Sequence, residues 1–63
     1  MFDLPFRVIG VAPDGLREPM VMCKDFAMAR DIVDTVLLRQ HPDHVFEICQ
    51  GIRVMVKVSA STP

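Results

Sequence analysis

Apolar residues recur at helical spacing between residues 25 and 40, and they alternate with polar residues on either side of that segment. Spacing of three and four residues predicts an amphipathic helix, whose apolar stripe consists of Phe26, Ala29, Ile32, Val33, Val36 and Leu37. The opposite side carries Ala27, Asp31, Asp34 and Leu38. Asp25 is a suitable N-cap, because its carboxylate can accept a hydrogen bond from a backbone N–H of the first turn. Pro42 disfavours helical backbone at His41, so we expect one helix over about residues 25–40.

The segment VFEICQGIRVMVKV, residues 45–58, alternates with the period of two that strands show, and it contains a turn. A two-residue Gln50-Gly51 turn would mix apolar and charged side chains on both faces. A three-residue loop over 49–51 separates them instead, and a one-residue slip would invert every side chain, so the pattern favours the three-residue loop. Gly51 then takes the left-handed position of that loop. The inward face predicted in this way consists of Phe46, Ile48, Ile52, Val54, Val56 and Val58.

A second hairpin is predicted before the helix. Its turn, APDGL, has Pro13 to fix φ and Gly15 for the left-handed position. Pairing Ala12 with Leu16 across this turn gives an inward face that consists of Phe6, Val8, Met20 and Met22. Pro19 has no backbone N–H for a neighbouring strand, so its strand is expected at an edge of the sheet. Gly10 indicates a bulge or a close approach of another group to the backbone.

These elements predict an α+β fold with ββαββ order. It is a two-layer structure in which one helix packs on one face of a four-stranded, mostly antiparallel sheet. The strand order does not follow from the sequence. At 63 residues, the chain is expected to form a single domain over 1–63, ordered from about 5 to 58, with a frayed polar tail at 59–63.

Composition bears on where the protein works and what it contacts. Hydrophobic residues make up 51% of the chain, and a domain of this size has little interior to hold them. Apolar side chains should therefore remain on the surface, which indicates a partner or a homodimer. The N-terminus does not resemble a secretory signal, and no apolar run approaches the about 20 residues that span a bilayer. We expect a cytoplasmic protein without a membrane partner, in which both cysteines stay reduced.

Residues typical of catalytic and metal sites gather in one segment, RQHPDHVFEICQG, residues 39–51. His41, Asp43, His44 and Cys49 do not follow the Cys-x2–4-Cys or His-x3–5-His spacing of zinc sites. In a regular strand His44 and Cys49 would lie about 16 Å apart, at about 3.3 Å per residue, which is too far for one zinc ion. We predict no metal, cofactor, small-molecule substrate or catalytic residue. A metal or thiol function at His41, His44 or Cys49 stays an alternative.

The predicted sheet face opposite the helix is the candidate site. We expect it to consist of Arg7, Ile9, Val11, Val21, Val45, Glu47, Arg53, Met55 and Lys57, with Glu47 opposite Arg53. An uncovered sheet face of this kind predicts a non-catalytic protein-interaction module, self-associating as a homodimer or docking on a larger complex.

The alternative is a nucleic-acid accessory protein that uses Arg7, Arg17, Arg53 and Lys57. RNA-binding sheets stack bases on outward-facing aromatic side chains. In the predicted register Phe6 and Phe46 point inward instead, and the chain has no Tyr or Trp.

No motif identifies a family. In size and ββαββ architecture the chain resembles small proteins of phages and bacterial mobile elements, several anti-CRISPR proteins among them. Such proteins act by occupying a surface of a larger complex. The resemblance implies an inhibitor that docks on a partner, and it assigns no residue to that role.

Overall fold

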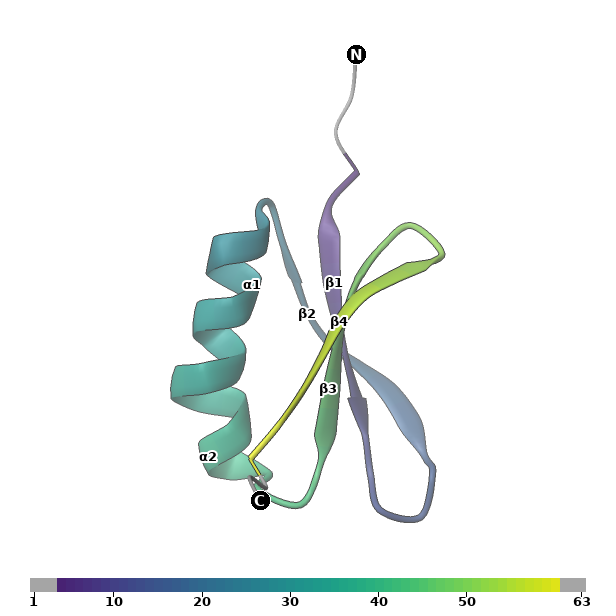
Figure 1. Ribbon diagram of the computed structural model, residues 1–63, viewed down its shortest axis with the longest axis vertical. Coiled ribbons are helices and arrows are strands. Elements are labelled where there is room, and N and C mark those ends of the chain that lie inside the picture. The colour runs from purple at the N-terminus through teal and green to yellow at the C-terminus, as the bar shows by residue number, and fades with distance from the viewer. Residues whose placement is uncertain (1–3, 61–63) are drawn as a thin grey trace.

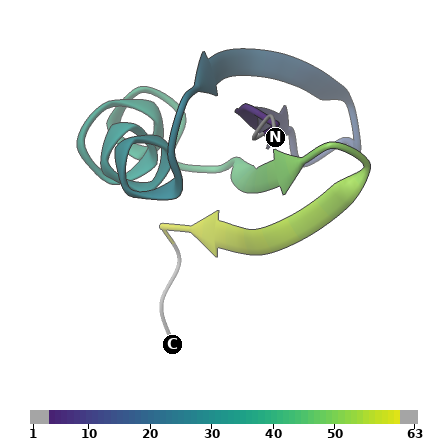
Figure 2. The ribbon, with the colours of Figure 1, turned by 90° about the horizontal axis from the view of Figure 1, so that it is seen from above.

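The computed structural model describes residues 4–60, and it confirms the predicted ββαββ fold. A four-stranded antiparallel sheet has the strand order β2-β1-β3-β4, and the helix lies on one side of it (Figures 1 and 2). The strands are β1 (Phe6–Val11), β2 (Arg17–Cys23), β3 (Val45–Gln50) and β4 (Arg53–Ser59). The helix consists of α1 (Phe26–Ile32), the π-helical turn η1 (Val33–Leu37) and α2 (Leu38–Gln40).

The helix begins and ends where the sequence predicts. The backbone N–H of Met28 donates a hydrogen bond of 2.8 Å to Oδ1 of Asp25, which confirms Asp25 as the N-cap. At the other end His41 leaves helical backbone, with φ −133° and ψ 72°. Pro42 follows directly, and it disfavours helical backbone at the residue before it.

The π-helical turn is a feature that the apolar spacing does not predict. A π turn holds more residues than an α-helical turn, so the side chains beyond it are rotated around the helix axis. Val36, expected in the buried stripe, is exposed. Leu38, expected on the solvent side, is half-buried and packs against the core.

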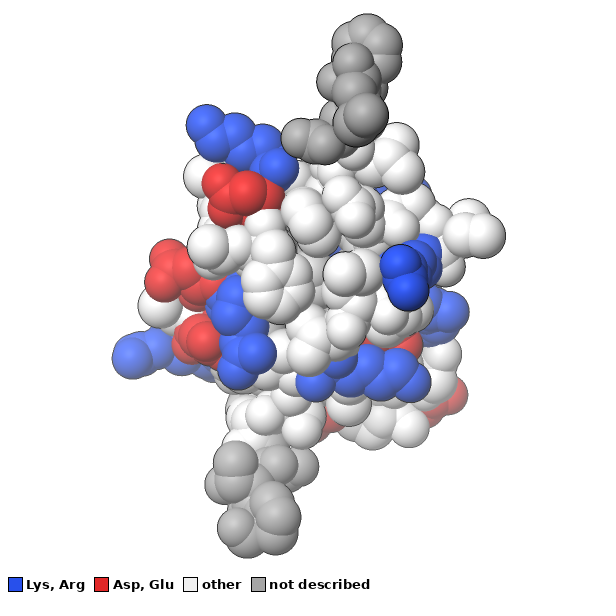
Figure 3. All heavy atoms as spheres, turned by 45° about the horizontal axis from the view of Figure 1, so that its top comes forward, with Lys and Arg blue, Asp and Glu red and all other residues white. Residues whose placement is uncertain are grey.

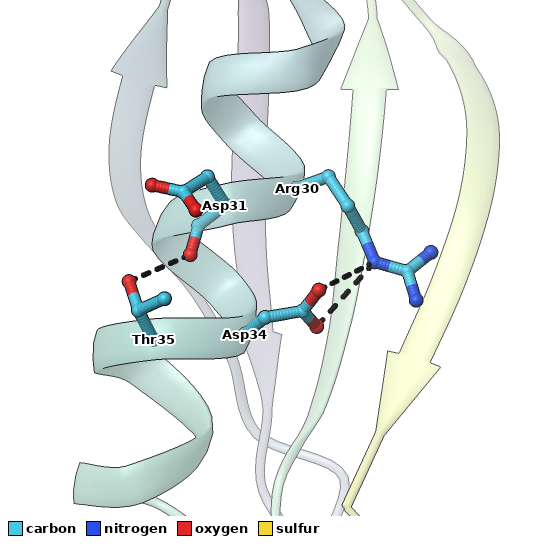
Figure 4. A network of polar contacts seen from close by, with 4 residues as sticks. All are labelled: Arg30, Asp31, Asp34 and Thr35. Carbon is cyan, nitrogen blue, oxygen red and sulfur yellow. Dashed lines mark hydrogen bonds and ion pairs between the residues drawn. The ribbon is translucent and has the colours of Figure 1, made fainter.

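Polar contacts line the solvent side of the same turn (Figure 4). The hydroxyl of Thr35 donates a hydrogen bond of 2.7 Å to the backbone carbonyl of Asp31, a contact that bends helices. Arg30 forms an ion pair with Asp34 one helical turn on, with Nε and Oδ2 separated by 3.2 Å. Both of its side chains are largely exposed, so the pair contributes only a few tenths of a kcal/mol.

The core lies between the helix and the inner strands β1 and β3. Its fully buried side chains come from both layers: Val8, Ala29, Val33, Phe46 and Ile48. Gly10 lies in this core, and the side chains of Met20 and Phe46 approach its backbone closely, as predicted. A Cβ at Gly10 would lie 3.1 Å from Sδ of Met20 and 3.2 Å from Cε1 of Phe46.

The predicted register of the first hairpin is right near its turn and wrong beyond it. Val11 pairs with Arg17 and Ile9 with Pro19, as expected, but a bulge then makes Val8 pair with Val21. Met20 is the extra residue, next to the proline that cannot donate to the ladder. Val21 therefore packs against the core, and Met22, predicted to be buried, is 62% exposed.

The second hairpin has a different turn from the predicted one. Gly51 and Ile52 form a two-residue turn, and Gln50 pairs with Arg53. Ile52 and Val54, both predicted in the core, are therefore exposed, with Ile52 at 105%. The positive φ of Gly51, +64°, is as predicted, and so is that of Gly15, +92°.

Beyond the β4 bulge, this hairpin keeps its predicted inward face despite the error in register. Val56 pairs with Ile48 and Val58 with Phe46, where the predicted loop placed residues four positions earlier. A shift by an even number of residues keeps each side chain on its face. Val58 is accordingly buried, and Val56 packs against the core.

The last strand extends beyond the predicted ordered region. β4 ends at Ser59, the first residue of the segment 59–63 that the sequence predicts to fray. Residues 61–63 of that segment lie outside the described residues. Within residues 4–60, no helix combines the length and the apolar composition that crossing a membrane requires.

Candidate functional site

The sheet has one face toward the helix and one face away from it, which we call the outer sheet face. Residues paired in an antiparallel sheet point to the same side, so the register assigns the members of this face. No helix or strand within residues 4–60 packs over it. Its three rows across the sheet are Arg17–Val11–Val45–Ser59, Pro19–Ile9–Glu47–Lys57 and Met22–Arg7–Cys49–Val54.

Most of the predicted interaction residues lie on the outer sheet face, namely Arg7, Ile9, Val11, Val45, Glu47 and Lys57. The others are displaced by the two bulges. Val21 turns toward the core, and Arg53 pairs with Gln50, on the helix side of the sheet. Met55 is the extra residue of the β4 bulge, and it is exposed.

The bulges also bring Met22 and Val54 to the outer sheet face, which sequence reasoning missed. The signals for the first bulge are Gly10 and Pro19, whose missing N–H interrupts the β2 ladder. Nothing in the sequence of β4 gives a comparable signal.

Glu47 lies at the centre of the outer sheet face and is only 8% exposed. Its Oε1 accepts a hydrogen bond from Arg17, whose side chain reaches from β2 across β1. Nζ of Lys57 lies 4.0 Å from Oε2 on the other side. The prediction that Glu47 lies opposite Arg53 is therefore wrong. A carboxylate removed from water needs such partners, and here two cations neutralise the single acid of the face.

Arg7 is exposed and has apolar neighbours on both sides in its row, Met22 in β2 and Cys49 in β3. Within residues 4–60 its guanidinium makes no hydrogen bond or ion pair with another side chain. Two shallow hollows share it. One, of about 190 Å³, is lined also by Pro19, Met20, Val21 and Met22. The other, of about 300 Å³, is lined also by Leu4, Pro5, Gly51 and Ile52.

We call Arg7, Leu4, Met22 and Ile52 the Arg7 cluster. Its three apolar members are exposed by more than half. Figure 3 views the molecule toward the end where β1 begins and the β3–β4 turn lies. Uncharged surface fills the centre of that view, and Lys and Arg side chains lie on both sides of it, interspersed with Asp and Glu on the helix side (Figure 3). The cluster thus combines an apolar surround with a cation that has no side-chain partner among the described residues.

The two histidines come together, but no cysteine joins them. The ring centroids of His41 and His44 are 4.7 Å apart, and the ring of His44 stacks on Phe46 at 5.9 Å. Nδ1 of His44 lies 2.8 Å from Oδ1 of Asp43. This hydrogen bond is the main reason why the pKa of Asp43 is lowered. Cys49 lies near the far end of β3, and residues 4–60 contain no group of three or more metal-ligating side chains.

Both cysteines are free thiols and both are buried. Burial, and secondarily the charge of Asp25, raises the pKa of the Cys23 thiol. A raised pKa lowers the fraction of thiolate, which is the nucleophilic form. Together with its burial, this makes Cys23 a packing residue.

The chain matches no protein-family model, no curated protein sequence and no solved structure. What the protein does must therefore be inferred from its own surface, on which the outer sheet face and the Arg7 cluster are the candidate sites.

Proposed function

We propose that the protein is a non-catalytic interaction module that binds another protein, or a second copy of itself, through its outer sheet face. The observation that carries this proposal is a sheet face with apolar side chains and no covering element in residues 4–60. Ile9, Val11 and Val45 are half-buried there, and Met22 is exposed. Apolar patches of this kind on small domains mark interaction sites.

The hollows beside Arg7, at the margin of the outer sheet face, support contact rather than catalysis. They are shallow and lined mainly by aliphatic side chains, so Arg7 has no acid or base beside it among their lining residues. Binding sites for small molecules are usually deep and enclose most of the ligand. A shallow surface that combines apolar side chains with cations fits a macromolecular partner better.

Docking on a larger complex, as in the small phage and mobile-element proteins of similar architecture, belongs to this proposal. It would require only the exposed surface described above. We place the protein in the cytoplasm, where free thiols such as Cys23 and Cys49 stay reduced.

Nucleic-acid binding is the second candidate, because Arg7, Arg17 and Lys57 share the outer sheet face. Arg17 and Lys57 are already engaged with Glu47. Phe6 and Phe46, the two phenylalanines in the strands, occupy the helix side, so neither provides a surface on which a base could stack. This arrangement favours a protein partner.

Site-specific photo-cross-linking in the source cells tests the proposal. A benzoylphenylalanine at Met22 reports on the outer sheet face, and the same group at Ala27 reports on the exposed side of the helix. We expect a discrete adduct of higher mass from Met22 and none from Ala27. Identical adducts from both positions, or none from Met22, would refute the proposal. Light scattering over a range of concentrations shows whether the partner is a second copy.

A further inference from the structure

Arg7 is the most distinctive residue of the outer sheet face, because it is a cation in an apolar surround that makes no side-chain hydrogen bond or ion pair within residues 4–60. Two hollows flank Arg7. Exposed Met22 lines one of them, and exposed Leu4 and Ile52 line the other. Binding hot spots have this composition, with an arginine or aromatic residue at the centre and apolar contacts that exclude water around it. An ion pair formed at Arg7 would be strengthened as the surrounding water is displaced.

The charge that the outer sheet face presents to a partner is positive. Its cations are Arg7, Arg17 and Lys57, and its one acid, Glu47, is buried and already paired. Glu18 lines a third hollow, beside Ile9, Arg17 and Pro19. It pairs with Gly10, so the register assigns it to the helix side. Electrostatic complementarity therefore requires an acidic partner.

A second copy bound face to face does not meet this requirement. A two-fold contact brings the same patch of both copies together, so that Arg7, Arg17 and Lys57 of one copy would face the same cations of the other. No unpaired acid of the outer sheet face is available to neutralise them. Like charges placed together across an interface oppose association.

We propose that the outer sheet face binds an acidic segment of a different protein, with a carboxylate on Arg7 and apolar side chains in the two hollows beside it. The guanidinium fork of arginine matches a carboxylate in two parallel hydrogen bonds. The neighbours Leu4, Met22 and Ile52 are aliphatic, and they suit Leu, Ile, Met or Phe side chains rather than nucleic-acid bases. This inference rests on the proposed function and adds the chemistry of the partner.

Selection from a random peptide library displayed on yeast tests the inference with the intact chain. We expect binders enriched in Asp or Glu, with large apolar residues nearby in the sequence. Arg7→Glu should weaken binding of the selected peptides about fivefold or more, since it replaces an attractive contact by a repulsive one. Lys24→Glu is the matched control, because it makes the same charge change in the connection between β2 and the helix. Lys24→Glu should leave the affinity for the selected peptides within about twofold of that of the unchanged protein. Circular dichroism and thermal melting establish that both variants fold.

The affinity for the selected peptides should also fall as the salt concentration rises. Replacing the acidic residues of a selected peptide by Asn or Gln should weaken its binding, as Arg7→Glu does. Neutral or basic binders, no enriched binder, or equal effects of Arg7→Glu and Lys24→Glu would overturn the inference. A dimer that is detected by light scattering and abolished by Arg7→Glu would also overturn it. The same holds for a single-stranded oligonucleotide that displaces the selected peptides at a lower concentration than an unlabelled selected peptide does.

The two proposals fail in different ways. An adduct from Met22 together with neutral peptide binders would retain the interaction surface and reject the acidic partner. The absence of any adduct specific to Met22 would reject the interaction surface itself.

Discussion

Breaking the ion pair between Arg17 and Glu47 is the sharpest test of how the outer sheet face is held together. Glu47→Gln removes the charge and keeps the size of the side chain. Arg17→Met and Lys57→Met remove the charge of each partner and keep much of its length. These variants, alone and combined, form two double-mutant cycles that share Glu47.

The structure sets different magnitudes for the two cycles. A hydrogen bond to a charged group contributes about 1.5–3 kcal/mol when it is shielded from water, and an exposed ion pair about 0.2–1 kcal/mol. The side chain of Glu47 is 11% exposed but that of Arg17 is 56% exposed, so we expect a coupling energy near the upper exposed value, about 1 kcal/mol. Lys57 is 65% exposed and 4.0 Å away, and its coupling should stay below about 0.4 kcal/mol.

Urea denaturation followed by circular dichroism measures the free energy of unfolding of each variant. The coupling energy with Arg17 corresponds to a shift of about 4–8 °C in the melting temperature of a domain this small. The slope of unfolding free energy against urea should stay unchanged, because no variant alters the buried core. Salt should reduce the Lys57 coupling more than the Arg17 coupling, since exposed charges are screened more.

The reasoning would be refuted by a coupling between Arg17 and Glu47 that cannot be distinguished from zero. A Lys57 coupling as large as that of Arg17 would refute it equally, because exposure and distance would then not decide the strength of these pairs.

Three further predictions concern stability. Gly10→Val should lower the free energy of unfolding by about 1–3 kcal/mol in urea denaturation, because the new side chain would push against Met20 and Phe46; an unchanged value would show that these two side chains move aside. Ile52→Ser should change the free energy of unfolding by less than about 0.5 kcal/mol, since Ile52 is fully exposed. A loss above about 1 kcal/mol would show that Ile52 is buried in the core. The folded chain keeps the proton of Cys23, whose thiol pKa is raised by burial and by Asp25, above the pH of about 8.5 at which the unfolded chain releases it. The free energy of unfolding should therefore fall as the pH rises above about 8.5, and Cys23→Ala should lack this fall.

The sequence predicts the layers of the fold well because burial depends on which face a side chain takes. The helix is predicted from Asp25 to Gln40, and its cap and end are confirmed. In β4, Val56 and Val58 point inward although their predicted partners are wrong. A period of two determines the face of a residue without determining its partner, so an even error in register leaves the core nearly unchanged.

The errors come from local geometry that periodicity cannot report. The π-helical turn exchanges the environments of Val36 and Leu38. The predicted three-residue loop places Ile52 on the inward face, but as part of a two-residue turn with Gly51 it is exposed. That turn lets all of β3 pair with β4.

The two bulges explain why the candidate surface nevertheless keeps the character predicted for it. Both lie beside the pair of Val8 and Ile48, one in β2 and one in β4, and beyond them the edge strands are shifted by one residue relative to β1 and β3. Without the first bulge Val21 would lie beside Arg7, and with it Met22 takes that place. In β4, Val54 takes the place opposite Cys49 that an unbroken register would give to Met55. Each exchange replaces one apolar residue by another, so Arg7 keeps an apolar surround in either register. The bulges change which residues form the Arg7 row and leave unchanged the chemistry that an acidic partner would meet there.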